Sequence, residues 1–325
     1  MLTRRTLLAA TAAAAAVPLA SARAQAWPTR PVTFLNGAPA GSTIDFVARL
    51  LADQLTNRLG QQVLVENRPG ASFNIATQAM LRAPADGYTI GFAPITMGTN
   101  PALMDIGYDP LKDVTMVTQI SAIPVVIVVG AHTPYRTLAE FVAFAKANPE
   151  KVTLGHGGTG TSGFLAAQLF AREAGFKVLP VPYGGTAPIF TAMLGGQIDG
   201  TFTPVDPSIP GHVAAGRMRV LGVMQPRRIA VLPDVPTTHE QGFGAAVDFR
   251  SWHGIMVRAG TPQPVVDRLY AEVHAIVGSP AVQERLAASG VEPALSASQA
   301  EFDAFYRGEI ARWTELVRAL NLKPQ

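Results

Sequence analysis

The residue types most able to do chemistry in this sequence gather in a glycine-rich stretch at residues 155–163. Thr159, Thr161 and Ser162 place three hydroxyl groups among its glycines, between an expected strand at 152–154 and an expected helix. The start of a helix presents unpaired backbone N–H groups and the positive end of the helix dipole. Glycine lets a ligand approach the backbone closely, and hydroxyl groups add donors. The stretch therefore predicts a binding site for a small anion.

A second stretch, at residues 36–43, has the same design. An expected strand at 33–35 leads into a loop rich in glycine and alanine, and a helix is expected from Ile44 onward. Asp45 falls in the first turn of that helix, where a carboxylate suits the dipole. Because the two loops are far apart in the chain, we expect them to hold one ligand from both sides.

Residues 158–163 also match the spacing G-x-G-x-x-G of a dinucleotide-binding turn. That fold places an acidic residue about 20 positions later, where it binds the ribose. No Asp or Glu lies between Glu173 and Asp199. We therefore favour a small anion over a nucleotide, and a purely structural turn is the third alternative.

The composition excludes several kinds of chemistry. The chain has no cysteine, which rules out disulfides, zinc–thiolate sites, iron–sulfur clusters and thiol nucleophiles. Its 6 histidines show none of the spacings that are typical of metal sites. We expect neither a metal nor a cofactor.

Residues 1–26 are expected to be an export signal. Arg4 and Arg5 precede an apolar run at 7–20, and small residues fit a cleavage site near Ala26. The signal resembles the twin-arginine type, with a Sec signal as the alternative, and either predicts a periplasmic protein. Loss of Arg4, Arg5 and Arg23 from the 26 basic residues would leave them equal in number to the 23 acidic ones. Net positive charge therefore does not support nucleic-acid binding.

A larger framework must position the two loops. At 325 residues the chain is expected to form two domains. Strand and helix patterns alternate, which predicts sheets covered by helices on both faces, with ligands at the carboxyl ends of the strands. The β-branched stretch at 114–129 is expected to carry the chain into the second domain, and 251–257 to return it. Residues 94–98 are expected to be a loop.

The chain also contains a series of short motifs. They are WPTRPV at 27–32, PAGSTID at 39–45, VENRPGA at 65–71, ADGYT at 85–89, YDPLKD at 108–113, LGGQID at 194–199 and LPDVPT at 232–237. In their order and spacing they resemble the periplasmic substrate-binding proteins of tripartite tricarboxylate transporters, the Bug or TctC family. The resemblance runs over nearly the whole chain after residue 26.

This resemblance implies an α/β, two-domain periplasmic-binding-protein fold of the Venus flytrap type, each domain a mostly parallel sheet flanked by helices. It implies that domain 1 takes residues 27–127 and 251–325, that domain 2 takes residues 128–250, and that the ligand lies between them. Such a protein is not an enzyme. It captures a small carboxylate, either a di- or tricarboxylate or an aromatic carboxylate, and delivers it as a monomer to permease subunits in the membrane.

The resemblance places the ligand on backbone amides and hydroxyl groups of the two loops identified above, with further contacts outside them. Some of these positions depart from the residues usual in the family and so bear on which carboxylate fits; they include Ala38, Phe73, His156, Thr203 and His253. The candidate ligand-binding residues are Ala38, Pro39, Ala40, Gly41, Ser42, Thr43 and Asp45 in the first loop, His156, Gly157, Thr159, Gly160, Thr161 and Ser162 in the second, and Phe73, Thr96, Thr203, Asp206, Arg250 and His253 elsewhere.

Several of these residues have a structural alternative. Asp45 could bond its own helix start, and Arg250 could form an interdomain salt bridge instead of holding a second carboxylate. His156 could donate to a carboxylate or stand exposed in its loop, and His253 could contact the ligand or pack in the core. Phe73 could lie flat on an apolar part of the ligand or join the core.

Two other functions fit parts of the sequence. An exported serine hydrolase could use Ser42 or Ser162, although neither lies in G-x-S-x-G and no His/Asp pair is placed to serve them. A ligand-sensing partner of a membrane receptor would use the same cleft and differ only in what docks on it. We favour a binding protein for transport over both.

Overall fold

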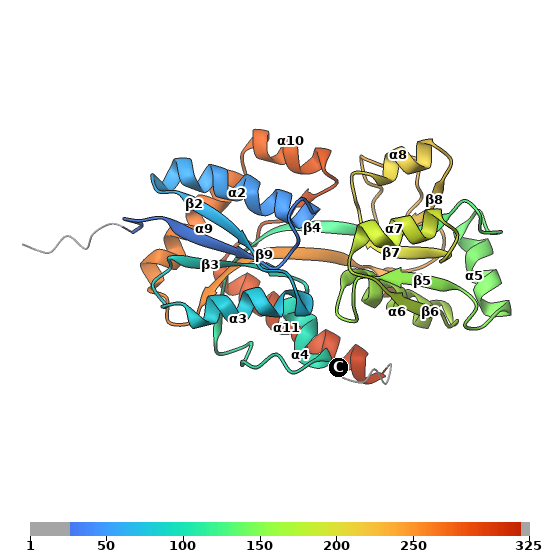
Figure 1. Ribbon diagram of the computed structural model, residues 1–325, viewed down its shortest axis with the longest axis horizontal. Helices are drawn as coiled ribbons and strands as arrows, with labels where there is room; N and C mark the ends of the chain where they lie inside the picture. The colour runs from blue at the N-terminus through green and yellow to red at the C-terminus, as the bar shows by residue number, and fades with distance from the viewer. Residues whose placement is uncertain (1–26, 320–325) are drawn as a thin grey trace, which may run out of the picture.

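The computed structural model describes residues 27–319, so the expected export signal lies outside the described residues. Figure 1 shows two lobes, each built on a layer of strands with helices on both faces, and long strands that pass between them. The expected α/β class and the flanking helices are confirmed.

The sheet of the first lobe combines parallel and antiparallel pairs. Its strands are β1 (Val32–Asn36), β2 (Val63–Asn67), β3 (Thr89–Pro94), β4 (Val114–Gly130), β9 (Arg250–Arg258) and β10 (Glu292–Pro293). β1 pairs in parallel with β2 and β3. β3 then pairs antiparallel with β9, and β9 pairs antiparallel with β4.

The sheet of the second lobe repeats this plan. Its strands are β5 (Thr153–His156), β6 (Leu179–Pro182), β7 (Gly200–Pro204) and β8 (Met218–Val223). β5 pairs in parallel with β6 and β7, while β7 and β8 both pair antiparallel with β4. Three parallel strands in each lobe therefore end toward the middle of the molecule, where ligands of such sheets bind.

Strand β4 belongs to both sheets. It pairs with β9 from Val114 to Pro124 and with strands of the second lobe from Val125 onward. The chain runs between the lobes in opposite directions along β4 and β9, which is why these two strands add antiparallel pairs to each sheet. The domain boundaries, residues 27–127 with 251–325 and residues 128–250, stay a prediction that this change of partners motivates.

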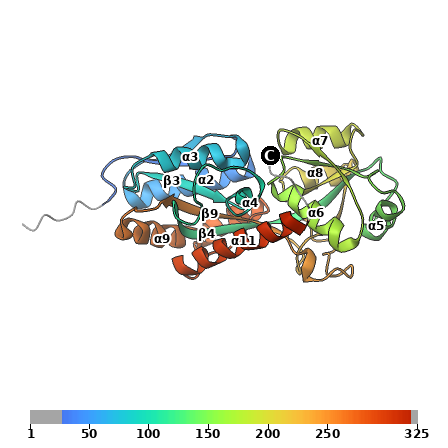
Figure 2. The same ribbon diagram turned by 90° about the horizontal axis from the view of Figure 1, so that it is seen from below.

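Helices cover both faces of the continuous sheet, as Figures 1 and 2 show. One buried cluster packs α2, α7 and α9 on one face, and a second packs α3, α4, α6 and α11 on the other. Within residues 27–319 no helix is both long and apolar enough to span a membrane. The helices are α2 (Thr43–Leu59), α3 (Asn74–Arg82), α4 (Thr96–Leu103), α5 (Leu138–Ala147), α6 (Ser162–Ala174), α7 (Thr186–Leu194), α8 (Ile209–Ala214), α9 (Gln263–Val277), α10 (Pro280–Ala288) and α11 (Gln299–Ala319), with short 3₁₀ turns η1 (Ala71–Phe73) and η2 (Ala245–Val247).

The expected loop at 94–98 is wrong in its second half, because α4 begins at Thr96. Gly98 and Pro101 are poor helix formers, so the local sequence did not predict a helix there. Met97 and Leu103 are each 1 % exposed within the cluster that includes α11. Tertiary packing therefore stabilises α4. Its start follows β3, just as the starts of α2 and α3 follow β1 and β2 in the same lobe.

Candidate functional site

The first loop, residues 37–42, is held from within by Asp45, which is 2 % exposed. Its Oδ2 accepts from the Gly41 N–H at 2.9 Å and from Arg49 Nε at 2.9 Å. Its Oδ1 accepts from Asn67 Nδ2 at 2.7 Å. The start of α2 thus already faces a carboxylate of its own chain. Of the two predicted roles for Asp45, this geometry favours the structural one.

These hydrogen bonds hold the pKa of Asp45 below its ordinary value. Burial alone would raise the pKa, but donation from Arg49, Asn67 and the Gly41 N–H outweighs that effect. The carboxylate is therefore charged at neutral pH and stays bound to the loop.

Ser42 completes the first loop as the N-cap of α2. Its Oγ accepts from the Asp45 N–H at 3.2 Å and donates to the Pro39 carbonyl at 2.8 Å. The candidate residues that this arrangement leaves at the surface are Pro39, Ala40 and Gly41, whereas Ala38 is buried and Thr43 is half-buried.

The second loop, residues 157–161, leaves its helix start open. Thr161 is the N-cap of α6, but its Oγ1 donates back to the Gly158 carbonyl at 2.7 Å and does not accept from the helix. The first turn of α6 contains no acidic residue. The N–H groups and the positive dipole end at Ser162 therefore have no carboxylate of their own, in contrast to those of α2.

His156 is the last residue of β5, immediately before this loop in the chain, and is 7 % exposed. Its Nδ1 accepts from the Gly158 N–H at 3.1 Å, so the ring proton stands on Nε2. Burial lowers the pKa of His156 below its ordinary value. His156 is thus a neutral side chain with one N–H donor, and it is buried instead of standing exposed in its loop.

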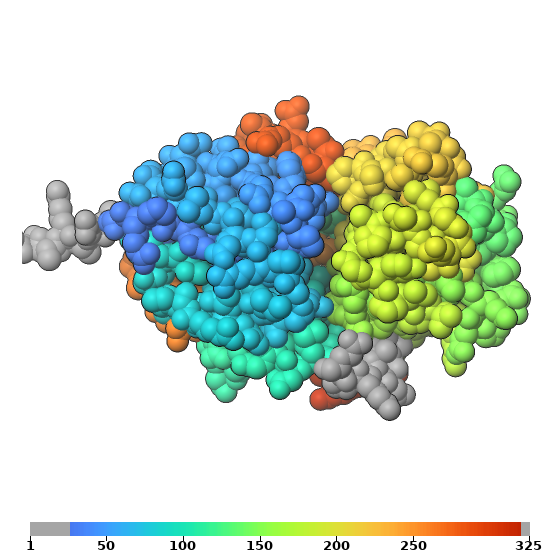
Figure 3. All heavy atoms as spheres, viewed as in Figure 1, coloured from blue at the N-terminus to red at the C-terminus, as the bar shows by residue number. Residues whose placement is uncertain are grey.

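The second loop touches the first lobe directly. Thr99 Oγ1 donates to the Gly160 carbonyl at 3.0 Å, and a Cβ atom on Gly160 would lie 2.8 Å from Asn100 Oδ1. Figure 2 shows α4 in the first lobe and α6 in the second, and Figure 3 shows the two lobes meeting along a narrow boundary, which we call the seam. The contact of Thr99 with Gly160 lies at this seam, so the second loop is part of the boundary between the lobes.

A turn with an unusual backbone, residues 71–73, lies at the same seam. Ala71, Ser72 and Phe73 have φ values of 43°, 48° and 72°, a backbone conformation that residues other than glycine adopt only at a cost in free energy. Asn100 Nδ2 donates to the Ser72 carbonyl at 2.8 Å, and the Phe73 ring lies against Gly37 of the first loop. The turn therefore links the first loop to α4, and it carries the half-buried Phe73.

Strand β9 brings two more polar side chains to this edge of the first sheet. Ser162 Oγ donates to Ser251 Oγ at 2.9 Å, so the start of α6 is bonded to the returning strand. His253 is fully buried, with its Nδ1 3.1 Å from Ser121 Oγ. Burial lowers the pKa of His253 to about 3, so the ring is neutral.

Three further candidate residues have polar partners within the chain. Arg250 is exposed and lies 4.0 Å from Glu292. Both residues belong to strands of the first-lobe sheet, so this contact is not the interdomain salt bridge of the predicted alternative, and the contact to a second carboxylate stays a prediction. Asp206 Oδ1 accepts from the N–H and the hydroxyl of Ser208, so it holds the turn that precedes α8. The Thr203 hydroxyl donates to the Pro204 carbonyl at 3.1 Å and is buried at the end of β7.

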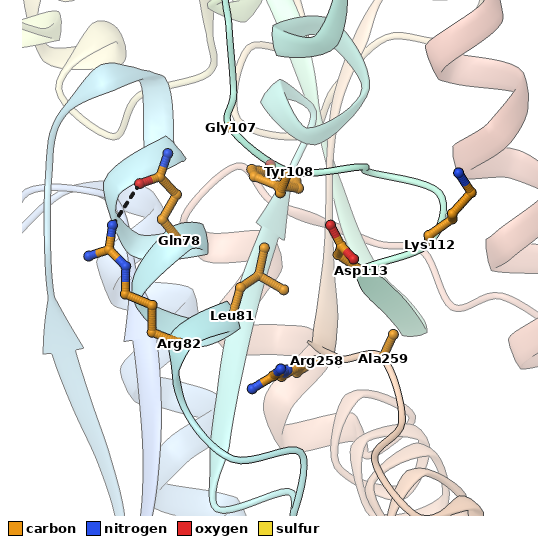
Figure 4. Close-up of a pocket in the computed structure, with 9 residues that line it drawn as sticks. All are labelled: Gln78, Leu81, Arg82, Gly107, Tyr108, Lys112, Asp113, Arg258 and Ala259. Carbon is orange, nitrogen blue, oxygen red and sulfur yellow. Dashed lines mark hydrogen bonds between the residues drawn. The ribbon is translucent and has the colours of Figure 1, made fainter.

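A cavity of about 750 Å³, drawn in Figure 4, lies away from the two loops. Its walls come from α3, from the loop at 107–113 before β4, and from the end of β9 that points away from the second lobe. Arg82 in this cavity donates to Gln78, and Arg258 donates to the Ala83 carbonyl at 2.7 Å. Its cations are thus engaged within the first lobe, and the cavity is not the predicted cleft.

Sequence reasoning missed Thr99, Asn100 and Ser251. The first two were hidden because α4 was not recognised, so no helix was expected beyond residue 98. Ser251 was included in the return strand, but nothing local indicates that it meets Ser162, which lies 89 residues away in the chain.

Two lobes joined by crossover strands, with strand ends and helix starts turned toward the seam, define a two-lobed solute-binding protein of the periplasmic type. The chain belongs to the tripartite tricarboxylate transporter family receptors (TctC), whose family model matches residues 47–322. The predicted resemblance is confirmed.

Relatives align over nearly the whole chain. A Bordetella bronchiseptica protein is 34 % identical over 325 residues, which cover 99 % of this chain and 95 % of the relative. The protein BugT of Bordetella pertussis is 31 % identical over 304 residues, which cover 92 % of each chain.

Solved structures of the family share the fold. The periplasmic binding protein BugD matches with a TM-score of 0.81 at 30 % identity, covering 92 % of this chain and 100 % of its own. An R. palustris protein with adipate matches with a TM-score of 0.84 at 31 % identity, with the same coverage of 92 % and 100 %. MatC from Rhodopseudomonas palustris, with bound malate, matches with a TM-score of 0.79 at 28 % identity, covering 90 % of this chain and 100 % of its own.

The family consists of solute-binding proteins, so this chain is a binding protein and not an enzyme. The geometry of the two serines agrees with this. Ser42 Oγ is engaged as a helix cap, and Ser162 Oγ donates to Ser251. Neither hydroxyl is hydrogen-bonded to a histidine among the described residues, as a serine hydrolase would require.

Proposed function

We propose that this protein captures a small carboxylate between its lobes and delivers it to the permease subunits of a tripartite transporter. The observation that carries the proposal is the open helix start of α6, which has neither a side-chain cap nor an acidic residue in its first turn. It lies at the seam, where Gly160 and Ser162 bond to the first lobe.

The chemistry of the second loop suits an anion held without a cationic partner. Backbone N–H groups at the helix start and the neutral N–H donor of His156 both favour negative charge. Binding by dipoles and not by a fixed cation lets the ligand leave again when the lobes separate. The adipate and malate carried by two structures of the family are consistent with a carboxylate ligand.

A thermal-shift screen tests the ligand class. We expect at least one acid among adipate, malate, citrate and benzoate to raise the melting temperature of the protein without its export signal. The shift should grow with ln(1 + [L]/Kd), as for any ligand that binds only the folded state. The matching neutral amides should give no shift, and failure of every acid would contradict the proposal.

Ligand capture is proposed to couple to closure of the lobes. The contacts of Gly160 and Ser162 with the first lobe form only when the lobes approach, so a ligand that needs both walls favours the closed form. Small-angle scattering with and without the bound acid measures this, and an unchanged radius of gyration would contradict closure.

Delivery to a permease from the periplasm is the second half of the proposal. It is supported by membership of the transporter receptor family and by the expected signal at residues 1–26. Deleting the gene should abolish uptake of the bound acid by whole cells, and the protein should be found in the periplasmic fraction. Uptake that continues without the protein, together with its capture by a membrane receptor kinase, would favour the sensing alternative.

A further inference from the structure

A second cavity, of about 530 Å³, lies beside the crossover strands, and we call it the crossover cavity. Its walls come from β4, β9 and α11 and from residues 225–227 and 248–249 of the second lobe. Within β9, Ser251 is bonded to Ser162 at the seam. Successive residues of a strand point to opposite faces, so the Trp252 side chain lies on the other side of β9 from this contact. The crossover cavity is therefore separate from the predicted cleft.

Aromatic side chains of the first lobe form one wall of this cavity. They are Trp252 of β9 and Phe305 and Trp313 of α11, a helix that runs along β4 and β9 and reaches the second lobe (Figure 2). The rings of Trp252 and Phe305 meet edge to face, with their centroids 5.6 Å apart. Phe305 is 38 % exposed, so a large apolar ring remains open to solvent. Such a wall suits a flat apolar group.

A buried carboxylate holds the two indole rings in place. Glu309 is 6 % exposed, and its Oε2 accepts from Trp252 Nε1 at 2.8 Å and from Trp313 Nε1 at 2.9 Å. A buried carboxylate is costly unless it is hydrogen-bonded. Glu309 thereby ties a ring of the crossover strand β9 to a ring of α11, so the aromatic wall is formed before any ligand arrives.

Guanidinium groups form the polar rim of the cavity. Two of them are engaged, because Arg250 lies 4.0 Å from Glu292, and Arg312 donates to the Asp248 carbonyl at 3.4 Å. The Arg227 side chain is exposed and makes no hydrogen bond or ion pair among the described residues. Its N–H donors are therefore available, and their planar arrangement matches a carboxylate.

Both acidic residues of the lining have partners within the chain. Glu309 is bonded to the two indoles, and Asp248 Oδ1 lies 2.7 Å from His239 Nε2 in the second lobe. An aromatic wall together with an unpaired guanidinium therefore favours a ligand that is flat and apolar at one end and anionic at the other.

We propose that the crossover cavity is a second ligand site, which binds an aromatic carboxylate with its ring against Trp252 and Phe305 and its carboxylate group on Arg227. A volume of about 530 Å³ is within the range of small-molecule sites, which commonly lie between domains and combine an apolar lining with a few polar groups. The site uses neither the second loop nor the start of α6, so it does not depend on the proposed function.

The two ends of such a ligand contact different lobes. Arg227 belongs to the second lobe and Phe305 to the first, so the ligand favours the arrangement in which both line one cavity. The seam contacts of Gly160 and Ser162 are formed in that same arrangement. A ligand in the crossover cavity should therefore strengthen binding of an acid in the cleft about fivefold or more, and the acid should strengthen the aromatic ligand by the same factor. This coupling, unlike the site itself, rests on the proposed function.

Calorimetry with 1-naphthoate tests the site, and 1-naphthamide is its neutral counterpart. We expect the wild type to bind the acid about tenfold more tightly than the amide or better. Arg227→Gln should remove most of this preference, because the charged partner of the carboxylate is lost, and Phe305→Ala should weaken both probes. Arg217→Gln is the matched control and should change affinity by less than about twofold. Arg217 is also exposed, has no side-chain partner among the described residues, and lies at the far end of β8.

Competition separates the crossover cavity from the cleft. An acid that the thermal-shift screen identifies should not displace 1-naphthoate and should tighten its binding, and an unchanged affinity would overturn the coupling. Displacement by that acid, no binding of 1-naphthoate, equal binding of the amide, or wild-type affinity in Arg227→Gln and Phe305→Ala would overturn the second site and leave the proposed function intact. If no acid of the screen binds, the proposed function fails, and the two variants still decide whether the crossover cavity binds 1-naphthoate.

Discussion

The two glycine-rich loops are alike in sequence and differ in how their helix starts are completed. In the first loop Ser42 caps α2 and Asp45 supplies a buried carboxylate to Gly41 and Arg49. In the second loop Thr161 turns its hydroxyl back to Gly158, and the first turn of α6 contains no acid. The first loop therefore contains its own anion, whereas the second contains none and is the loop for which we propose a ligand.

This difference shows that a strand, a glycine loop and a helix do not by themselves define an anion site. The deciding feature is an acidic residue in the first helical turn, because it competes with any external anion for the same N–H groups and dipole. By this criterion α2 is closed, while α4 and α6 are open. The ligand is thus expected between α4 and α6, with the first loop as a rigid wall beside them.

The largest expected effect comes from removing the internal anion of the first loop. Asp45→Asn should lower the free energy of unfolding by about 3 kcal/mol, because a buried group loses hydrogen bonds from Gly41, Arg49 and Asn67 that an amide cannot all accept. Urea denaturation measures the change. Asp53→Asn, at an exposed position of the same helix, is the control and should stay within about 0.5 kcal/mol.

The pH dependence of the stability of Asp45→Asn tests whether the charge of the Asp45 carboxylate stabilises the first loop. The folded-state pKa of Asp45 is lowered from its ordinary value of 3.8, so its contribution to stability is present above that pH and is lost as pH falls through the folded-state value. The wild type should therefore lose more stability than Asp45→Asn when the pH drops below about 4. Parallel pH profiles would show that the carboxylate does not stabilise the loop.

The next effect concerns the contact of the second loop with α4. Gly160→Ala should weaken ligand binding about tenfold or more, because its Cβ atom would lie 2.8 Å from Asn100 Oδ1, and Asn100 is fixed by its bond to Ser72. Gly211→Ala is the matched control and should leave affinity unchanged, since no atom from outside its own helix lies within 4 Å of its added Cβ atom. Calorimetry measures both affinities.

A double variant distinguishes a clash between the lobes from a change confined to the second loop. Asn100→Ala in the Gly160→Ala background makes room for the added methyl group and should recover part of the lost affinity. Equal affinity of Gly160→Ala and wild type would mean that the second loop and α4 are apart in the ligand-bound protein. The ligand would then not lie between α4 and α6.

The sequence predicted those parts of the fold that depend on local pattern. The crossover expected at 114–129 is β4 (Val114–Gly130), and the return strand expected at 251–257 is β9 (Arg250–Arg258). Both glycine loops precede helices, as expected. These features could be read because apolar periodicity and glycine clusters act over a few residues.

The roles of individual side chains depended on contacts that local pattern does not contain. Asp45 is engaged by Asn67 through β-sheet pairing, and Ser162 meets Ser251 across the seam. Arg250 lies near Glu292, a residue on a strand too short to be expected. Helix α4 was missed because packing, and not propensity, stabilises it. The sequence could therefore indicate the two loops at which an anion site was expected, but not which of their helix starts lacks an acidic residue of its own that is bonded to the loop.

The smallest expected effect compares the two caps directly. Ser42→Ala should lower the free energy of unfolding by about 1 kcal/mol, because the N-cap hydroxyl that accepts from the Asp45 N–H is lost. Its ligand affinity should stay within about twofold of wild type, since the start of α2 is already occupied from within. Thr161→Ala should show the reverse. Affinity should fall several-fold, because the Thr161 hydroxyl holds the second loop through the Gly158 carbonyl, and stability should fall less, because Thr161 does not cap α6. Chemical denaturation and calorimetry on the two variants give this crossed pattern or refute it. If Ser42→Ala were the one that weakened binding, the first loop would be the open site, and the assignment of ligand and internal anion to the two loops would have to be exchanged.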